Sequence, residues 1–186
     1  MTATDGALKR RLAGDLDRHF PALVNEMQGV VYNGARRWLR GRQDAEDVTQ
    51  EAFVRAYQAL QGYPPQRILD LHLRPWLFTI TLNLCRNHAR TRSRRPRQAA
   101  LDMTREVPGT TEVEKDAVEA LVIDEWRDRL SQLSPRQRDA VVLRHVVGLS
   151  YAEIGEVLGR PAGTVKSDVS RGLGRLRTLL LSEELQ

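Results

Sequence analysis

The sequence predicts an all-α protein of two small helical domains joined by a flexible linker. Apolar residues recur at helical spacing through most of the chain, and no segment shows the alternation of a strand. A stretch that contains proline and glycine separates two such blocks. The second block carries the complete start and stop signals of two consecutive helices. A chain of 186 residues has room for two domains of this kind.

The first forty residues predict a leader followed by one long helix. Residues 1–17 are polar with scattered apolar residues, so we expect a disordered leader there. Phe20 to Trp38 places its apolar side chains at helical spacing, and Gly41 is expected to close that helix.

Two further helices are expected before residue 95. Asp44 is a good N-cap for a helix that runs to about Leu60, and the Gly62-Tyr63-Pro64-Pro65 segment then forces a loop. Arg74-Pro75-Trp76 starts another helix that reaches about Arg92. These helices define a first domain over residues 18–95.

Charge and composition separate the two domains. Six arginines and no acids lie between Arg86 and Arg97, whereas Asp102 to Asp128 holds nine acids and three bases. Pro96, Pro108 and Gly109 interrupt the chain where the charge changes sign, so we expect an acidic linker over residues 96–118. The second domain then occupies residues 119–182.

The clearest local signal is a helix-turn-helix near the C-terminus. Ser150 and Glu153 form an S-x-x-E capping box, Gly159 ends that helix, and Arg160-Pro161 starts the next. The apolar stripe of the second helix is expected to comprise Val165, Val169, Gly172, Leu173, Leu176 and Leu180.

The opposite side of that second helix is small, polar and basic, which suits the major groove of DNA. It carries Lys166, Ser167, Ser170, Arg171, Gly174, Arg177 and Thr178. Asp168 lies near the edge of the apolar side, where it can pair with a nearby arginine instead of facing DNA. The alternative to base reading by Arg171 is that it pairs with Asp168 at the i, i+3 spacing and never meets DNA. Gly172 and Gly174 each cost about 1 kcal/mol relative to alanine, so we expect the helix to fray or bend beyond Arg171.

Composition favours a polyanionic partner and excludes several classes. The net charge is +5, and 26 of the 29 basic residues are arginine, which suits nucleic acid, although codon bias in a GC-rich genome is an alternative. Cys85 is the only cysteine, so no disulfide or cysteine-based zinc site is expected. Four scattered histidines show no ligand spacing, so we expect no metal, cofactor or catalysis. No apolar run or signal-peptide core appears, so we expect a cytoplasmic protein without membrane insertion.

Two clusters on the first-domain helices suggest binding surfaces. Thr79, Asn83, Arg86 and Arg90 form a polar stripe between two apolar sides, suited to single-stranded nucleic acid; a solvated helix face is the alternative. Acids at the start of the preceding helix fit its dipole. Gln50, Glu51 and Arg55 lie beyond the first turn, so the helix dipole explains these residues poorly.

Four motifs resemble the two conserved regions of bacterial sigma factors of the extracytoplasmic-function (ECF) group. These are DAEDVTQEAFVRAY (44–57), RPWLFTITLN (74–83), LSPRQRDAVVLRHVVGLSYAEIGEVLG (133–159) and GTVKS (163–167). The resemblance implies a three- to four-helix region two, a helix-turn-helix region four, and a sigma factor that directs RNA polymerase to promoters and helps to open them. Its expected partners are promoter DNA, the clamp helices of the largest core subunit and the flap of the second-largest. An anti-sigma factor is a further candidate partner.

The resemblance also implies three sets of contact residues. Those for core polymerase are Asp44, Glu46, Asp47, Gln50, Glu51 and Arg55. Those for the minus-ten element are Thr79, Asn83, Arg86, Asn87 and Arg90. Those for the minus-thirty-five element are Thr164, Lys166, Ser167, Ser170, Arg171 and Arg177. Asn87 and Leu82 depart from the residues usual in the family, as do Asp168, Ser170, Gly172 and Gly174.

The alternative function is a free-standing helix-turn-helix regulator that binds duplex DNA without polymerase. A regulator of that kind shifts its operator alone at physiological salt, whereas a sigma factor needs core polymerase. The sequence names neither the promoters nor the inducing signal.

Overall fold

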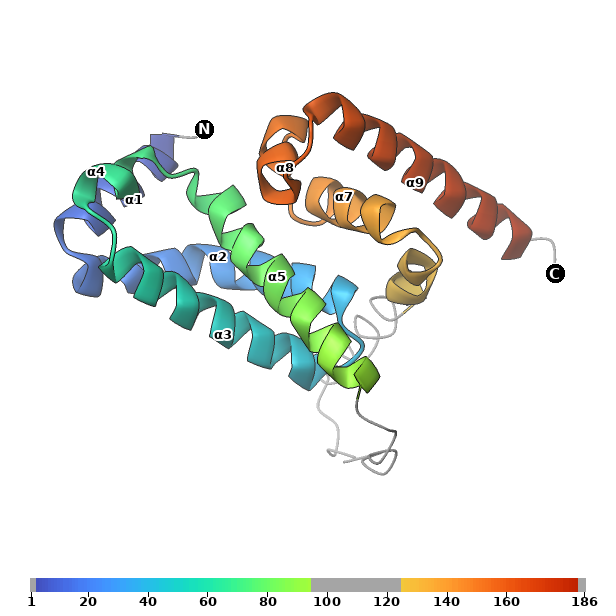
Figure 1. The fold of residues 1–186 in the computed structure, drawn as a ribbon, viewed down its shortest axis with the longest axis horizontal. Coiled ribbons are helices and arrows are strands. Elements are labelled where there is room, and N and C mark those ends of the chain that lie inside the picture. The colour runs from blue at the N-terminus through green and yellow to red at the C-terminus, as the bar shows by residue number, and fades with distance from the viewer. Residues whose placement is uncertain (1–2, 95–124, 184–186) are drawn as a thin grey trace, which may run out of the picture.

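The structure is a computed structural model that describes residues 3–94 and 125–183, and the expected linker over 96–118 lies outside these ranges. Every regular element within them is an α-helix, so the predicted all-α fold is confirmed there (Figure 1). Residues 125–131 are also helical. The labelled helices are α1 (Ala3–Gly14), α2 (Leu16–Trp38), α3 (Arg42–Gln61), α4 (Pro65–Asp70), α5 (Leu73–Arg94), α7 (Pro135–His145), α8 (Tyr151–Leu158) and α9 (Ala162–Glu183). None of these helices is long and apolar enough to cross a lipid bilayer.

The prediction of a disordered leader is wrong for most of residues 1–17. Residues 3–14 form α1, which packs against α2 and α4. Leu8 and Leu12 are four residues apart on one face of α1, and both are buried in the core. The ammonium group of Lys9 donates a hydrogen bond to the carbonyl of Leu71 at 3.1 Å. The two leucines were too few to mark a helix by periodicity, yet they anchor one.

Three boundaries in the first domain differ from the prediction. Gly41 does not close α2, because α2 ends at Trp38. Gly41 is instead the N-cap of α3. Asp44 therefore lies in the first turn of α3 and is not its cap. The expected loop after Gly62 includes the short helix α4, because Pro65 occupies a first-turn position where it needs no N–H partner.

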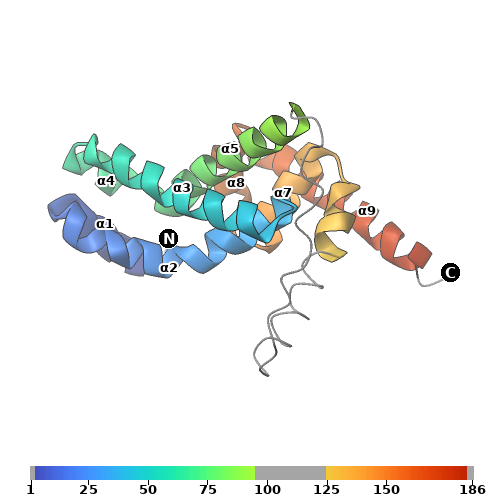
Figure 2. The same ribbon diagram turned by 90° about the horizontal axis from the view of Figure 1, so that it is seen from below.

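The first domain packs α2, α3 and α5 around a common core, with α1 and α4 at one end (Figures 1 and 2). The largest fully buried side chains of this core are Leu12, Leu23, Val31, Leu60, Leu77, Phe78 and Leu82. This arrangement leaves one side of α3 and the C-terminal half of α5 available at the surface.

The helix-turn-helix is confirmed in geometry. The Ser150 hydroxyl accepts from the Glu153 N–H at 3.3 Å, and the Glu153 carboxylate accepts from the Ser150 N–H at 2.8 Å. Gly159 ends α8 with φ of 64°, a left-handed conformation that glycine adopts without steric cost. Gly155 permits the tight turn, since a Cβ there would lie 2.6 Å from the Arg160 carbonyl oxygen.

The second helix of the helix-turn-helix, α9, runs without a break from Ala162 to Glu183, so it does not fray directly after Arg171. Gly172 faces α7, where an added Cβ would lie 2.7 Å from a methyl carbon of Val141. Its missing side chain lets the two helices approach closely, and this contact offsets the cost of glycine within a helix. Gly174 has nothing within contact distance of an added Cβ.

The two domains pack against each other. Buried side chains of α5, α7 and α8 belong to one continuous apolar cluster. An added Cβ on Gly34 of α2 would lie 3.6 Å from Val147, and the Arg74 guanidinium donates to the Val147 carbonyl. His72 Nδ1 lies 2.8 Å from the Glu156 carboxylate. Helix α9, the second helix of the helix-turn-helix, lies on the far side of α7 and α8 from α5 (Figure 1).

Candidate nucleic-acid and protein interfaces

The N-terminal half of α3 presents the predicted acidic face, but its charges are partly paired within the helix. Glu46 accepts from Arg42 at 2.9 Å, and Glu51 accepts from Arg55 at 2.7 Å. These i, i+4 pairs are exposed, so each contributes only a few tenths of a kcal/mol and can exchange for a partner. Asp44 is half-buried, and its carboxylate lies 3.5 Å from the ring of His88 on α5.

Asp47, Gln50 and Glu51 are exposed and share one side of α3. The same side continues into an apolar hollow between α2 and α3, which sequence reasoning missed. The hollow is lined by Phe20, Phe53, Val54, Tyr57, Gln58 and Gln61. Val54 is 51% exposed, which is high for a valine beside such a hollow. The placement of Val54 four residues after Gln50 was the available signal for this apolar extension.

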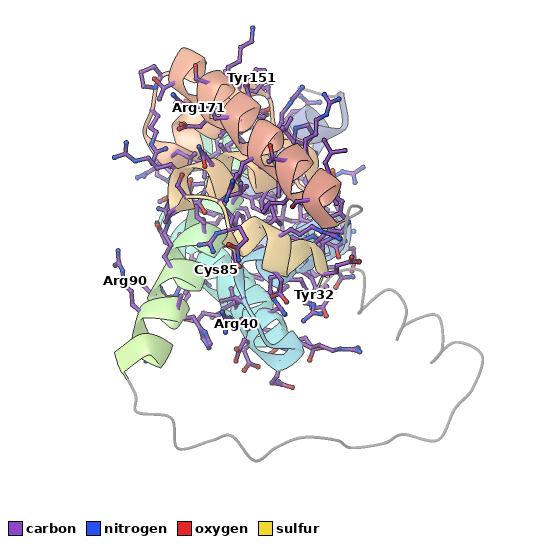
Figure 3. All side chains as sticks on the ribbon, turned by 90° about the vertical axis from the view of Figure 1, so that its right-hand side faces the viewer. Tyr32, Arg40, Cys85, Arg90, Tyr151 and Arg171 are labelled. Atoms are coloured by element: carbon purple, nitrogen blue, oxygen red, sulfur yellow. The ribbon has the colours of Figure 1, made fainter. Side chains whose placement is uncertain are left out.

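The predicted α5 stripe comprises Thr79, Asn83, Arg86, Asn87 and Arg90, and it is only partly open. Thr79 is half-buried, and its hydroxyl already donates to the Pro75 carbonyl at 3.0 Å. Asn83, Asn87 and Arg90 are exposed. Figure 3 shows Arg90 projecting away from the helices.

Arg86 of the stripe forms an ion pair with the second domain. Its guanidinium donates to the carboxylate of Asp139 on α7 at 2.7 Å, and the Asp139 side chain is only 6% exposed. A buried carboxylate requires a partner, because an unpaired charge in the protein interior is costly. Sequence reasoning missed Asp139, whose position beside two apolar residues of α7 gave no sign that it faces α5.

Cys85, next to Arg86, is a core residue. It is 2% exposed, and burial together with the negative charge of Asp139 raises the pKa of its thiol to about 12. Figure 3 places Cys85 among the packed helices. At neutral pH the thiol is therefore protonated and shielded, which fits a packing role.

The outer face of α9 carries every predicted contact residue for duplex DNA. Thr164, Lys166, Ser167, Ser170, Arg171 and Arg177 are all exposed. Figure 3 shows Arg171 on α9 at the surface. Leu173 was expected on the apolar stripe but is 41% exposed, so that part of the prediction is wrong. The other members of the predicted stripe that are buried are Val165, Val169, Gly172 and Leu176.

Asp168 lies under this face with its side chain 9% exposed. One carboxylate oxygen accepts from Arg171 at 3.1 Å, as the i, i+3 spacing predicted. The other oxygen accepts from Arg160 at 3.2 Å, and this second partner was not predicted. Arg160 lies in the turn before α9, eight positions before Asp168. Because Arg160 is outside the helix, helical spacing gave no signal for the contact.

A polar and basic face on a helix-turn-helix, joined to a second helical domain with an arginine-bearing stripe, defines a two-domain DNA-binding protein. Residues 23–95 match the family model "Sigma-70 region 2", and residues 123–176 match "Sigma-70, region 4".

Curated relatives agree with both matches. The chain is 35% identical over 169 residues to the RNA polymerase sigma-E factor of Streptomyces avermitilis, covering 89% of this chain and 87% of that protein. It is 30% identical to the ECF RNA polymerase sigma factor SigW of Bacillus subtilis, covering 93% and 94%. The ECF factor SigE of Mycolicibacterium smegmatis is 36% identical, and the chain spans 60% of that longer protein.

A solved structure supports the same assignment at the level of the fold. The structure described as CnrH in complex with the cytosolic domain of CnrY superposes with a TM-score of 0.72 at 27% identity, covering 96% of this chain and 97% of that one. The chain therefore belongs to the sigma-70 family, and it is an ECF-type sigma factor. Sigma factors of this family are transcription initiation factors and not enzymes.

Proposed function

We propose that this sigma factor divides promoter-directed initiation among three surfaces of its own chain. The acidic face of α3 docks on core RNA polymerase, the α5 stripe holds the separated strand of the minus-ten element, and the outer face of α9 reads the minus-thirty-five element. The occurrence of region two and region four in one chain and in this order carries the proposal. The protein then acts in the cytoplasm, where core polymerase and promoters are found.

The chemistry of each surface supports its role. Exposed carboxylates on α3 suit a basic helical partner, and the neighbouring apolar hollow adds buried area to such an interface. Guanidinium and amide groups on α5 suit phosphates and splayed bases of a single strand. The capped helix-turn-helix places a polar helix face where it can enter a major groove.

An anti-sigma factor is part of the proposal as a regulatory partner. Two proteins of similar fold were solved with a bound protein partner: CnrH with the cytosolic domain of CnrY, and the Bartonella quintana sigma factor RpoE with the anti-sigma factor NepR. The first of these is 27% identical to this chain over nearly its full length. A partner that covers the acidic face of α3 would block polymerase docking.

Run-off transcription tests the proposal against a free-standing regulator. Core polymerase, this protein and fragments of its source genome are expected to give discrete transcripts only when all three are present. Gel shifts at physiological salt are expected to show specific binding only with core polymerase. A specific shift by the chain alone, without transcripts in the reconstituted reaction, would establish the regulator instead.

A further inference from the structure

Asp168 is a buried acidic residue on the helix that carries the predicted contacts to duplex DNA. Its side chain is 9% exposed, so it cannot reach a base edge itself. Its two carboxylate oxygens are each engaged by a different arginine, at 3.1 Å and 3.2 Å. Asp168 thereby connects Arg160 in the turn to Arg171 on the outer face of α9.

The charge balance of this cluster favours a role in binding DNA. An isolated pair of Asp168 and Arg171 would be neutral and would attract DNA weakly. Arg160 supplies a second positive charge, so the three side chains together carry a net charge of +1. The Arg171 side chain remains 64% exposed, whereas that of Arg160 is 23% exposed. The surplus charge is therefore presented mainly through Arg171.

The hydrogen bonds of Arg171 leave its recognition capacity intact. A guanidinium has five N–H donors, and Arg171 gives one nitrogen, Nη2, to Asp168. Within the described residues, Asp168 is the side chain to which Arg171 is seen to donate. Two parallel donors suffice to pair with the O6 and N7 atoms of guanine. A guanidinium anchored at one corner can still present such a pair.

Anchoring also changes the cost of binding. A free arginine must lose rotamer freedom when it meets a base, and that loss weakens the interaction. A side chain already held by a buried carboxylate has lost part of this freedom before DNA arrives. The same anchor fixes where the donors point, so one base pair is favoured over its neighbours.

From these contacts we infer that Asp168 is a positioning residue for promoter reading, which holds Arg171 so that it selects one base pair of the minus-thirty-five element. The inference rests on the proposed role of α9. Arg160 keeps the cluster cationic. It also links Arg171 to the turn, because the backbone N–H of Arg160 donates to the Gly155 carbonyl at 2.9 Å and so holds Arg160 in place.

Selection from a promoter library randomised across the minus-thirty-five element tests the inference, with the full-length protein bound to core polymerase. Arg171→Ala is expected to flatten the preference at one base pair, roughly ten-fold. Asp168→Asn is expected to flatten the same base pair by a similar factor. The double variant is expected to be no worse than Arg171→Ala, since Asp168 acts through Arg171. Asp128→Asn, which also removes an acid from beside an arginine, is the charge-matched control and is expected to keep the wild-type preference.

Two outcomes separate the inference from the role of α9. If Arg171→Ala flattens one base pair and Asp168→Asn leaves the preference unchanged, the positioning role is overturned and the role of α9 stands. If neither Arg171→Ala nor Lys166→Ala alters promoter binding, the assignment of α9 itself fails. Should Asp168→Asn not fold, Asp168→Glu retains the charge and displaces the anchor by one methylene. An altered preference at the Arg171 base pair then supports the inference, and an unaltered one refutes it.

Discussion

The guanidinium of Arg86 on α5 lies 2.7 Å from the buried carboxylate of Asp139 on α7. This ion pair joins the α5 stripe, proposed to bind the minus-ten strand, to the domain proposed to read the minus-thirty-five element. Asp139 engages one nitrogen of Arg86, Nη2, so in the proposed role of α5 this carboxylate competes with the minus-ten strand for the guanidinium. We therefore expect α5 and α7 to separate at this contact when the promoter opens.

Cys85 offers a measurement of that separation. Burial and Asp139 hold its thiol pKa at about 12, so we expect very slow modification by maleimide at pH 7.5 in the free protein. Arg86→Gln leaves Asp139 buried without its partner and should weaken the contact by roughly 1–2 kcal/mol, because Arg86 is itself partly exposed. The modification rate should then rise about 5- to 30-fold.

The direction of this effect is diagnostic. Removing Arg86 leaves the negative charge of Asp139 in place beside the thiol, so the pKa of Cys85 should not fall while the contact stays closed. Faster modification must then come from opening of the contact, which exposes the thiol and removes the burial that raises its pKa. Equal rates for Arg86→Gln, Asp128→Asn and the wild type would show that the ion pair does not hold the domains together.

Docking on core polymerase should depend on the acidic face of α3. The double variant Asp47→Lys and Glu51→Lys is expected to abolish co-purification with core polymerase while the far-ultraviolet circular dichroism stays unchanged, because both side chains are exposed. Glu26→Lys with Glu125→Lys gives the same charge change on other exposed positions and should bind normally. Normal binding by the α3 variant would remove this face from the interface.

Contacts on the outer face of α9 should separate into two kinds. Lys166→Ala is expected to weaken all promoter sites similarly and to reduce the salt dependence of binding by about one unit of slope, as for a phosphate contact. Arg171→Ala is expected to cost about 1–3 kcal/mol on the preferred site and to relax one position. Filter binding of the holoenzyme at several salt concentrations distinguishes them, and identical salt slopes for the two variants and the wild type would contradict the assignment.

The two glycines of α9 should respond in opposite directions to the same substitution. Gly172→Ala places a methyl group 2.7 Å from a carbon of Val141 and should destabilise the protein by about 1–3 kcal/mol. Gly174→Ala meets open space and should stabilise it by roughly 0.5–1 kcal/mol through helix propensity. Urea denaturation measures both, and a stable Gly172→Ala variant would show that α7 and α9 can move apart without cost.

The capping box of α8 should make stability depend on pH. Burial would raise the pKa of Glu153, but hydrogen bonds from Ser150 and the nearby charge of Arg74 outweigh it and hold the pKa below its usual value. The ionised carboxylate therefore stabilises the fold above a pH of about 4.5, and this contribution is lost as pH falls below that. Glu153→Gln should lower the melting temperature at pH 7 and have less effect at pH 3.5. An equal effect at both pH values would contradict the role of the charge.

Much of this architecture could be predicted because its signals are local. The Ser150 capping box, Gly159 and the spacing of Val165, Val169 and Leu176 specify the helix-turn-helix within thirty residues. Contacts between distant segments left no such trace. Leu8 and Leu12 do not reveal that α4 covers them, and Gly172 looks unfavourable until Val141 is seen against it. Arg171 could be paired with Asp168 from the helical repeat, whereas Arg160 approaches from a turn whose path only the folded chain defines.

The absence of a methyl group at Gly155 fixes the angle between α8 and α9, since a Cβ there would collide with the Arg160 carbonyl oxygen at 2.6 Å. Any larger residue would force this turn to shift, and we expect the proposed DNA contacts of α9 to be displaced together. New promoter preferences can therefore arise readily by exchange of surface side chains on α9, one base pair at a time. A change of docking angle would instead abolish the old preferences before new ones exist, so the turn limits the route by which this protein can diverge.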